Sequence, residues 1–305
     1  MKTASVALVD AFTDVPLRGN PAGVVLDAAD LDESLRLKIA REIGASETVF
    51  VENLTDDGSR FRTRFYTPTS EVDLCGHATI AAYHHLAEIG EIAVGEEAVT
   101  VEQETRVGLL GVTLRPRDEG ATPRVWMDMV APTVETPEIS LAKLAAMFGI
   151  GKAQIDERNP IQIVSTGIRS LHVPLKAISH FPDLKPLRGK VIDLCREHEL
   201  ATVQLFTLET EDAAAHAHAR VFAPAVGVDE DPVTGTAAGA LGAYLVLNKA
   251  VTPTEDSVRL LVEQGGEIDR QGFVSVEIGL EDAEITTVRV GGSAVTVYQG
   301  EMRVE

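Results

Sequence analysis

A duplicated pattern constrains the fold of this chain more than any other feature. The first half contains Arg64–Pro68 followed by Asp73–Ala78, and the second half contains Arg220–Pro224 followed by Asp231–Ala237. Each copy has the pattern of a strand, a polar loop and a helix of small residues that opens with glycine. A repeat about half a chain apart predicts two similar lobes. If both helix starts face one cleft, their N–H groups and dipoles would suit a small anionic molecule.

Strand patterns dominate the rest of the chain, with one long apolar helix expected in each half. Alternating segments such as Val6–Phe12 and Phe61–Tyr66 predict strands, and Cys75–Ile89, rich in alanine, predicts a buried helix. The strands are not separated by regularly spaced helices, which argues against a doubly wound parallel sheet. We therefore predict an α+β protein of two lobes, each a curved sheet wrapped around a central helix.

Two shorter helices have clear ends in the sequence. Leu31 begins an apolar spacing of four residues that continues to Ile43, and Gly44 follows as a stop signal. Ser140 is expected to cap a second helix, which Gly149 closes.

The length of 305 residues fits two domains of ordinary size. The Pro- and Gly-containing segment Arg115–Pro123 is the best linker candidate. We predict an N-terminal lobe over 1–118, with the tail 292–305 able to pack back on it, and a C-terminal lobe over 119–291.

The charge, the cysteines and the length of the apolar runs limit the partners and the compartment that we expect. A net charge of −20, from 27 basic and 47 acidic residues, disfavours nucleic acid and anionic membranes. Two cysteines, Cys75 and Cys195, form no disulfide framework, which favours a reducing cytoplasm. The first ten residues are too short and too polar for a signal peptide, and no apolar run reaches membrane-spanning length.

The first lobe offers three candidate site residues. Glu47 lies where a helix gives way to an apolar strand, and partial desolvation of its carboxyl group would suit a general acid or base, although a solvated surface glutamate fits too. His77, at a helix start, could bind an anion or simply cap its own backbone. Cys75 could act as a low-pKa thiol at a helix N-terminus, but a packing role ranks higher.

The second lobe offers matching candidates at its own helix start. Asp231 could hold a substrate amino or hydroxyl group, and Thr236 stands close by, but helix capping alone explains Asp231 equally well. The backbone N–H groups that follow Gly76 and Gly235 could bind a carboxylate.

No cofactor or metal motif is apparent. The chain has no Gly-x-x-x-x-Gly-Lys-Ser/Thr phosphate loop, dinucleotide fingerprint or Cys-x-x-Cys. His216 and His218 alternate on a strand without ligand-spaced carboxylates, so we expect a solvated strand face rather than a metal site. His84 and His85 are expected on a helix surface.

Six segments together resemble the phenazine-biosynthesis PhzF-like family in order and spacing, from about Val9 to the C-terminus: Gly19–Gly23, Ser46–Thr48, Cys75–Thr79, Ser165–Gly167, Glu230–Ala237 and Glu263–Gly265. The resemblance implies a diaminopimelate epimerase-like fold of two pseudo-symmetric β-lobes with the site between them. It also implies a homodimer that uses no cofactor or metal, and an isomerase of trans-2,3-dihydro-3-hydroxyanthranilate or a similar acid.

Compared residue by residue, the resemblance implies that Glu47 is the catalytic acid/base. It also implies that His77 and Asp231 lie in the cleft. Thr236 stands where the family has serine, and the phenazine enzymes have Ala-Gly-His-Pro where this chain has Cys75–Ala78. The expected substrate-binding set comprises Asn20, Gly76, His77, Asp231, Gly235 and Thr236.

The leading hypothesis is a cofactor-independent isomerase that moves a proton within a small carboxylic or amino acid through Glu47. One alternative is an epimerase or dehydratase that depends on Cys75. Diaminopimelate epimerases and proline racemases, which resemble the chain more distantly, need a cysteine in each lobe, and the second position is Thr234 here. Another alternative is a protein that binds a small molecule without catalysis.

Overall fold

The computed structural model describes residues 3–117, 121–254, 256–282 and 284–304. The chain forms two compact units: unit 1 comprises Met1–Asp128 and Gly291–Glu305, and unit 2 comprises Met129–Val290. The expected linker, 115–123, instead connects two antiparallel strands, β7 and β8, although its residues 118–120 lie outside the described part. The division therefore falls after residue 128 and not at 118.

Unit 1 is a mixed, mainly antiparallel arrangement of strands. β1 pairs with β2 and β18, β3 with β4, and β4 with β5, all antiparallel; β6–β7 and β7–β8 are antiparallel as well. Only β2–β3 and β4–β6 are parallel among these pairs. The strands are β1 (Thr3–Ala11), β2 (Asn20–Val25), β3 (Glu47–Asn53), β4 (Arg60–Tyr66), β5 (Glu71–Val72), β6 (Val99–Thr105), β7 (Gly108–Arg115), β8 (Arg124–Met129) and β18 (Ala294–Arg303).

Unit 2 repeats this topology strand for strand. β10–β11 is antiparallel, β11–β12 parallel, β12–β13 and β13–β14 antiparallel, β13–β15 parallel and β15–β16 antiparallel. β9 pairs with β10 as β18 pairs with β1. The strands are β9 (Thr133–Glu135), β10 (Gln162–Ser165), β11 (Arg169–Pro174), β12 (Thr202–Thr207), β13 (Ala217–Ala223), β14 (Val228–Asp231), β15 (Ser257–Gln264), β16 (Gly272–Glu281) and β17 (Glu284–Gly292).

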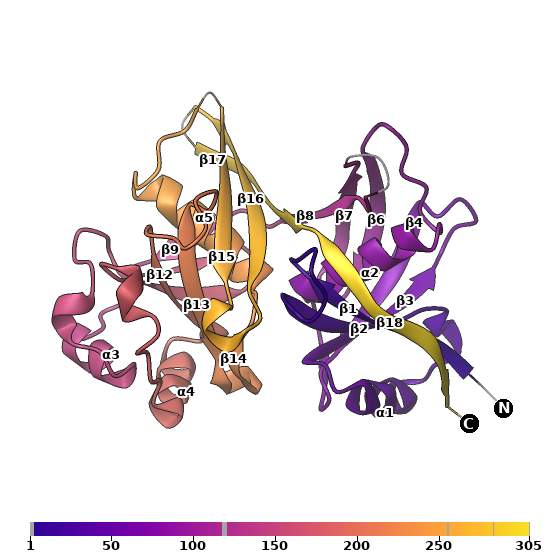
Figure 1. Cartoon of the computed structure of the whole chain (residues 1–305), viewed down its shortest axis with the longest axis horizontal. Helices are drawn as coiled ribbons and strands as arrows, with labels where there is room; N and C mark the ends of the chain where they lie inside the picture. The colour runs from indigo at the N-terminus through magenta and orange to yellow at the C-terminus, as the bar shows by residue number, and fades with distance from the viewer. Residues whose placement is uncertain (1–2, 118–120, 255, 283, 305) are drawn as a thin grey trace. The chain divides into compact units, whose positions relative to one another are not determined.

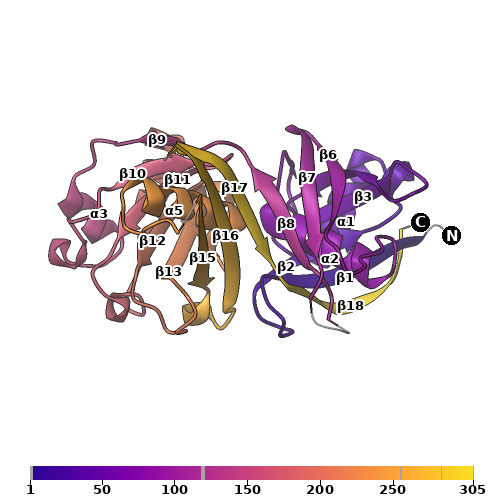
Figure 2. The ribbon, with the colours of Figure 1, turned by 90° about the horizontal axis from the view of Figure 1, so that it is seen from above.

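A long helix runs through the strands of each unit (Figures 1 and 2). α2 (Gly76–Glu88) and α5 (Gly235–Leu247) have 13 residues each. α2 packs against β1, β2, β3 and β18, and α5 packs against β10, β11, β15 and β16. Small residues permit this close packing: a Cβ added at Gly242 would lie 2.7 Å from Val276 Cγ1. The duplicated pattern in the sequence therefore corresponds to two units, in each of which the strands wrap around one helix, as predicted.

Three shorter helices cover the sheets, and local signals define their ends. α1 (Glu33–Ile43) begins where Asp32 Oδ1 accepts a hydrogen bond from Leu35 N at 2.8 Å, and it ends at Gly44, whose φ is 73°. In α3 (Leu141–Met147), Ser140 caps the first turn as expected. The third is α4 (Arg188–Glu197). The described residues also include the 3₁₀ helices η1 (Ala28–Asp30), η2 (Lys152–Gln154), η3 (Ile178–His180), η4 (Pro224–Val226) and η5 (Gly266–Ile268). Within the described residues, no helix combines the length and apolar character needed to cross a bilayer.

Candidate active site

Glu47 is the first residue of β3, on the face of the sheet that carries α2. After the left-handed residue Gly44 the chain turns into β3, where Glu47 pairs in register with Ala22 of β2. The next residue, Thr48, points to the opposite face, because an added Cβ on Gly23 would meet Thr48 Oγ1 and a side-chain atom of α1. The Glu47 side chain keeps 18% of its area exposed. It is therefore largely withdrawn from water but still reachable.

A buried hydrogen-bond chain holds the start of α2 against the sheet. Cys75, the residue before the helix, has extended backbone angles, and its carbonyl oxygen accepts a bond from Thr79 Oγ1 at 2.8 Å. Gln103 Nε2 of β6 donates to Thr79 Oγ1 at 3.2 Å and to Thr63 Oγ1 of β4 at 2.9 Å. Because these groups are buried, losing one partner would leave another polar group unsatisfied. The position of the first helical turn is thus fixed by β4 and β6.

Glu47, Cys75 and His77 meet at this helix start. His77 Nε2 lies 3.4 Å from Glu47 Oε2, and His77 Nδ1 lies 3.4 Å from Cys75 Sγ. One ligand atom from each of the three residues falls within 4.8 Å of the others. Cys75 and His77 are buried, with 8% and 7% of their surface exposed. The structure therefore brings together the three candidates that the sequence placed in the first lobe, and their catalytic roles stay predictions.

Two other expected binding residues lie beside this cluster. Asn20 begins β2, is fully buried, and lies two residues before Ala22, the register partner of Glu47. Alternation along the strand places Asn20 on the same face of the sheet as Glu47. Gly76 is the first residue of α2. The backbone N–H groups in the first turn of a helix have no hydrogen-bond acceptor within the helix, so they can bind an anion.

In unit 2, Thr234 occupies the position of Cys75, directly before α5. Thr234 Oγ1 donates to Asp231 Oδ2 at 2.5 Å, and the Thr234 side chain makes no capping bond to the helix. Gly235 is the first helical residue, and the buried Thr236 is the second, as His77 is in α2. Asp231 is half-buried. Thr234, and not Asp231, occupies the N-cap position of α5, and a role of Asp231 in substrate binding is still a prediction.

Strand register corrects one detail of the repeat. Asp231 pairs with Val221 of β13, whereas Val72 pairs with Phe65 of β4. Asp231 therefore corresponds to Val72 and not to Asp73. Unit 1 has no carboxylate at the position of Asp231, and unit 2 has no thiol at the position of Cys75.

Gln264, at the end of β15, contacts two of these residues and was not among the candidates identified from the sequence. Its Nε2 donates to the Asp231 carbonyl oxygen at 2.7 Å and to Thr234 Oγ1 at 3.2 Å, and its Oε1 accepts from Thr234 N at 3.1 Å. Gln264 thus holds the loop before α5, as Gln103 holds the start of α2. The Glu263–Gly265 segment carried the signal, but only as part of the family resemblance.

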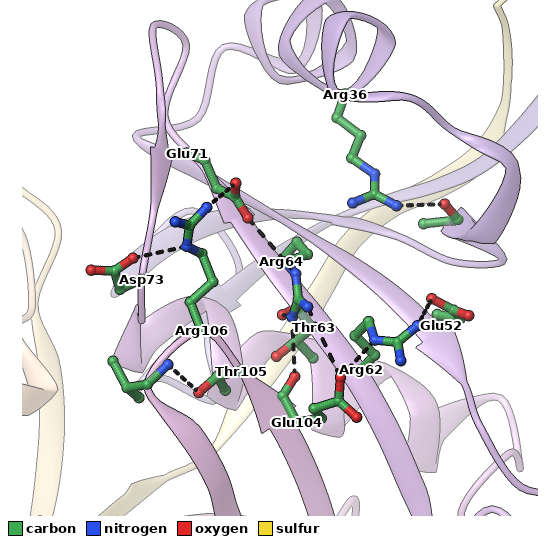
Figure 3. Close-up of polar contacts among 12 residues, drawn as sticks. Arg36, Glu52, Arg62, Thr63, Arg64, Glu71, Asp73, Glu104, Thr105 and Arg106 are labelled. Atoms are coloured by element: carbon green, nitrogen blue, oxygen red, sulfur yellow. Dashed lines mark hydrogen bonds and ion pairs between the residues drawn. The ribbon is translucent and has the colours of Figure 1, made fainter.

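Ion pairs brace the loop that leads to Cys75 (Figure 3). Arg106 reaches Glu71 of β5 at 2.8 Å and Asp73 at 3.1 Å, and Arg64 lies 3.8 Å from Glu71. Arg106 is more than half exposed, so solvent screens its two ion pairs and they contribute little to stability. Their main effect is to hold β5 and the following loop in one conformation.

His218 is buried between two carboxylates, so the expected solvated strand face is wrong for this residue. His218 Nδ1 lies 2.9 Å from Glu263 Oε1, and His218 Nε2 lies 2.8 Å from Glu267 Oε1. Burial alone would lower the pKa of His218, but Glu267 and Glu263 outweigh it and raise that pKa. His216, two residues earlier, is exposed as expected.

His84 and His85 also differ from expectation, because α2 is enclosed rather than at the surface. Both are buried, and desolvation lowers the pKa of His84 to about 4. His84 is therefore neutral at physiological pH.

Comparisons with known proteins agree on one family. The model of the family described as "Phenazine biosynthesis-like protein" matches residues 9–300. An uncharacterised isomerase of Clostridium acetobutylicum is 35% identical over 295 residues, covering 96% of each chain. A PhzF-family phenazine biosynthesis protein of Bacillus anthracis, known from its crystal structure, is 34% identical with a TM-score of 0.89, covering 99% of this chain and 100% of that one.

A more distant structure supports the wider fold. A hydroxyproline epimerase from Agrobacterium vitis is 15% identical with a TM-score of 0.66, covering 99% of this chain and 91% of that one. At this identity the likeness concerns the fold alone. The α+β, diaminopimelate epimerase-like fold expected from the sequence is thereby confirmed.

Proposed function

Because the chain belongs to the phenazine biosynthesis-like family, we propose that it is a cofactor-independent isomerase that moves a proton within a small carboxylic or amino acid. The observation that carries this proposal is the Glu47 carboxylate, largely withdrawn from water and 3.4 Å from His77 at a helix start. Uncharacterised isomerases among its relatives support the reaction class. Dihydro-hydroxyanthranilate-like acids are the first substrate class to test.

In the proposed reaction, Glu47 is both base and acid. Its carboxylate removes a proton from an activated substrate carbon, which leaves a delocalised carbanion and a neutral Glu47. Glu47 then returns the proton to another carbon, so the double bond moves and nothing is oxidised or reduced. Proton transfer by a positioned side chain contributes roughly 10²–10⁴ in rate.

The neighbouring groups would bind and orient the substrate. His77 lies next to Glu47, and the N–H groups after Gly76 could hold a substrate carboxylate and stabilise developing negative charge. Asp231, Gly235 and Thr236 of unit 2 would contribute further substrate contacts, since they repeat the helix-start arrangement. We further propose that the protein is cytoplasmic and acts as a homodimer. Light scattering of the purified chain would test the oligomeric state.

The experiment is proton exchange in heavy water, followed by NMR across a panel of dihydro-hydroxyanthranilate and related acids. Glu47→Gln should reduce turnover by about 10²–10⁴ while the fold is retained. Glu52→Gln, five residues further along β3, is the matched control and should keep near-normal turnover. A Glu47→Gln enzyme with near-normal turnover would refute the assignment.

A Cys75-dependent epimerase or dehydratase is the second candidate, favoured by the 3.4 Å separation of Cys75 Sγ and His77 Nδ1. An imidazole at this distance can take the thiol proton and activate the sulfur. Exchange at a substrate α-carbon that survives Glu47→Gln but is lost in Cys75→Ala would identify this reaction. Tight binding without turnover of any compound would instead identify a binding protein.

A further inference from the structure

Glu47, Cys75 and His77 carry three different metal-binding groups at one point. Among the residues that the structure describes, theirs is the group of three or more His, Cys, Asp or Glu whose ligand atoms lie within 4.8 Å of one another. We propose that these residues form a binding site for a thiophilic divalent cation of the zinc class.

The donor set selects the class of metal. A thiolate, an imidazole and a carboxylate are the three kinds of ligand that zinc uses in proteins. Thiolate sulfur is a poor ligand for magnesium and calcium, which prefer oxygen donors. The site therefore discriminates zinc, or its spectroscopic substitute cobalt, from the abundant hard cations.

Two of the three ligand separations approach those of a tetrahedral centre. Zinc binds sulfur at about 2.3 Å and nitrogen or oxygen at about 2.0–2.2 Å, which corresponds to ligand-to-ligand distances of about 3.3–3.7 Å. Glu47 Oε2 lies 3.4 Å from His77 Nε2, within this range, and Cys75 Sγ lies 3.9 Å from the same nitrogen. A shift of a few tenths of an ångström in the sulfur would bring the Cys75–His77 separation into this range. The Cys75 sulfur and the Glu47 carboxylate lie within 4.8 Å of each other and would move closer together on binding the metal.

The backbone around the ligands is held in place. Cys75 and His77 flank Gly76 at the first turn of α2, and Thr79 hydrogen-bonds the Cys75 carbonyl oxygen at 2.8 Å. Glu47 comes from β3, so the three donors belong to two elements that pack against each other. Such pre-organisation lowers the conformational cost of binding a metal.

Three protein ligands leave the fourth tetrahedral position open to water or a substrate carboxylate. A cation bound here would occupy the Glu47 carboxylate that the proposed proton transfer requires. This consequence rests on the proposed function: metal and productive substrate would then exclude each other, and zinc would inhibit the isomerase.

The test is a titration of the purified full-length protein with Co²⁺ and then Zn²⁺, with no substrate present. We expect one equivalent of Co²⁺ to bind with a near-ultraviolet thiolate-to-cobalt absorption band, which Zn²⁺ abolishes and excess Mg²⁺ does not. Cobalt bound to surface histidines lacks this band, so the band reports a cysteine ligand.

Variants identify the ligands. Cys75→Ser should abolish the thiolate band. Glu47→Gln and His77→Gln should each weaken Co²⁺ binding at least about tenfold, because even groups that only hydrogen-bond a metal ligand typically cost that much when they are replaced. Cys195→Ser is the matched control: Cys195 is buried in unit 2, desolvation raises the pKa of its thiol to about 11, and the band should persist. Circular dichroism confirms that each variant is folded.

Two results would overturn the proposal. One is the absence of a thiolate band in the wild type at millimolar Co²⁺, and the other is a band that survives Cys75→Ser or disappears in Cys195→Ser. Because the titration needs no turnover, it stands even if the isomerase assignment fails. If zinc still inhibited turnover of Cys75→Ser, that result would refute only the proposed competition between metal and substrate.

Discussion

Replacing His218 by glutamine should destabilise unit 2 strongly. His218 is 2% exposed and lies between Glu263 and Glu267, whose side chains are 1% and 13% exposed. The substitution removes the positive charge and leaves two carboxylates close together in a poorly solvated place. Removing one partner of a buried ion pair costs about 3–5 kcal/mol. For a unit of this size, that loss corresponds to a fall in Tm of about 6–20 °C.

The loss should depend on pH in a defined way. The raised pKa of His218 means that its contribution is complete below pH 6.5, its ordinary value, and is lost as pH rises through the higher folded-state pKa. Burial opposes ionisation of Glu267, but the bond from His218 lowers its pKa, so its contribution is present above pH 4.5 and is lost as pH falls through the folded-state value. The difference between wild type and His218→Gln should therefore be largest between pH 4.5 and 6.5.

The assay is urea unfolding and calorimetry of both proteins across this pH range. His216→Gln is the matched control, because His216 is exposed on the same chain segment and its side chain accepts a hydrogen bond from Leu261 N at 3.1 Å; this substitution should cost about 1 kcal/mol or less. If the two units unfold separately, the change should be confined to one transition. A His218→Gln loss no greater than the control, or one independent of pH, would refute this reasoning.

Three further substitutions test helix capping and local packing through the free energy of unfolding, measured in urea. Asp32→Ala removes the bond to Leu35 N and should cost about 1 kcal/mol; an unchanged midpoint would contradict capping. Gly242→Ala should lose up to about 2 kcal/mol, because overpacking against Val276 at 2.7 Å outweighs the gain in helix propensity. Gly189→Ala, in the exposed first turn of α4 with open space around the added Cβ, should instead gain about 0.4–1 kcal/mol, and the same sign for both glycines would refute the packing argument.

Local features were predictable from the sequence because they depend on residues within one or two turns. Gly44 ends α1 and Ser140 begins α3 through bonds to backbone groups three or four residues away, and small residues mark the two enclosed helices. The duplicated pattern predicted two similar sheets, because equal patterns of strand and helix bury equal faces. The family resemblance and the candidate residues at each helix start followed from the same short segments.

Contacts between distant strands were decided only by the tertiary structure. Register placed Asp231 opposite Val221 and so aligned it with Val72, whereas the sequence motifs had suggested Asp73. The division after residue 128 depends on which strands β8 and β9 join, and a linker-like composition at 115–123 does not report that.

The surroundings of individual side chains could not be predicted from the sequence either. The sequence shows His216 and His218 alternating, but only the parallel pairing of β13 with β15 brings Glu263 to the buried one. In the same way, the sequence identified Glu47, Cys75 and His77 one by one. Their meeting at 3.4 Å depends on β3 and α2 packing together, because contact between side chains far apart in the chain is set by register and burial and not by local propensity.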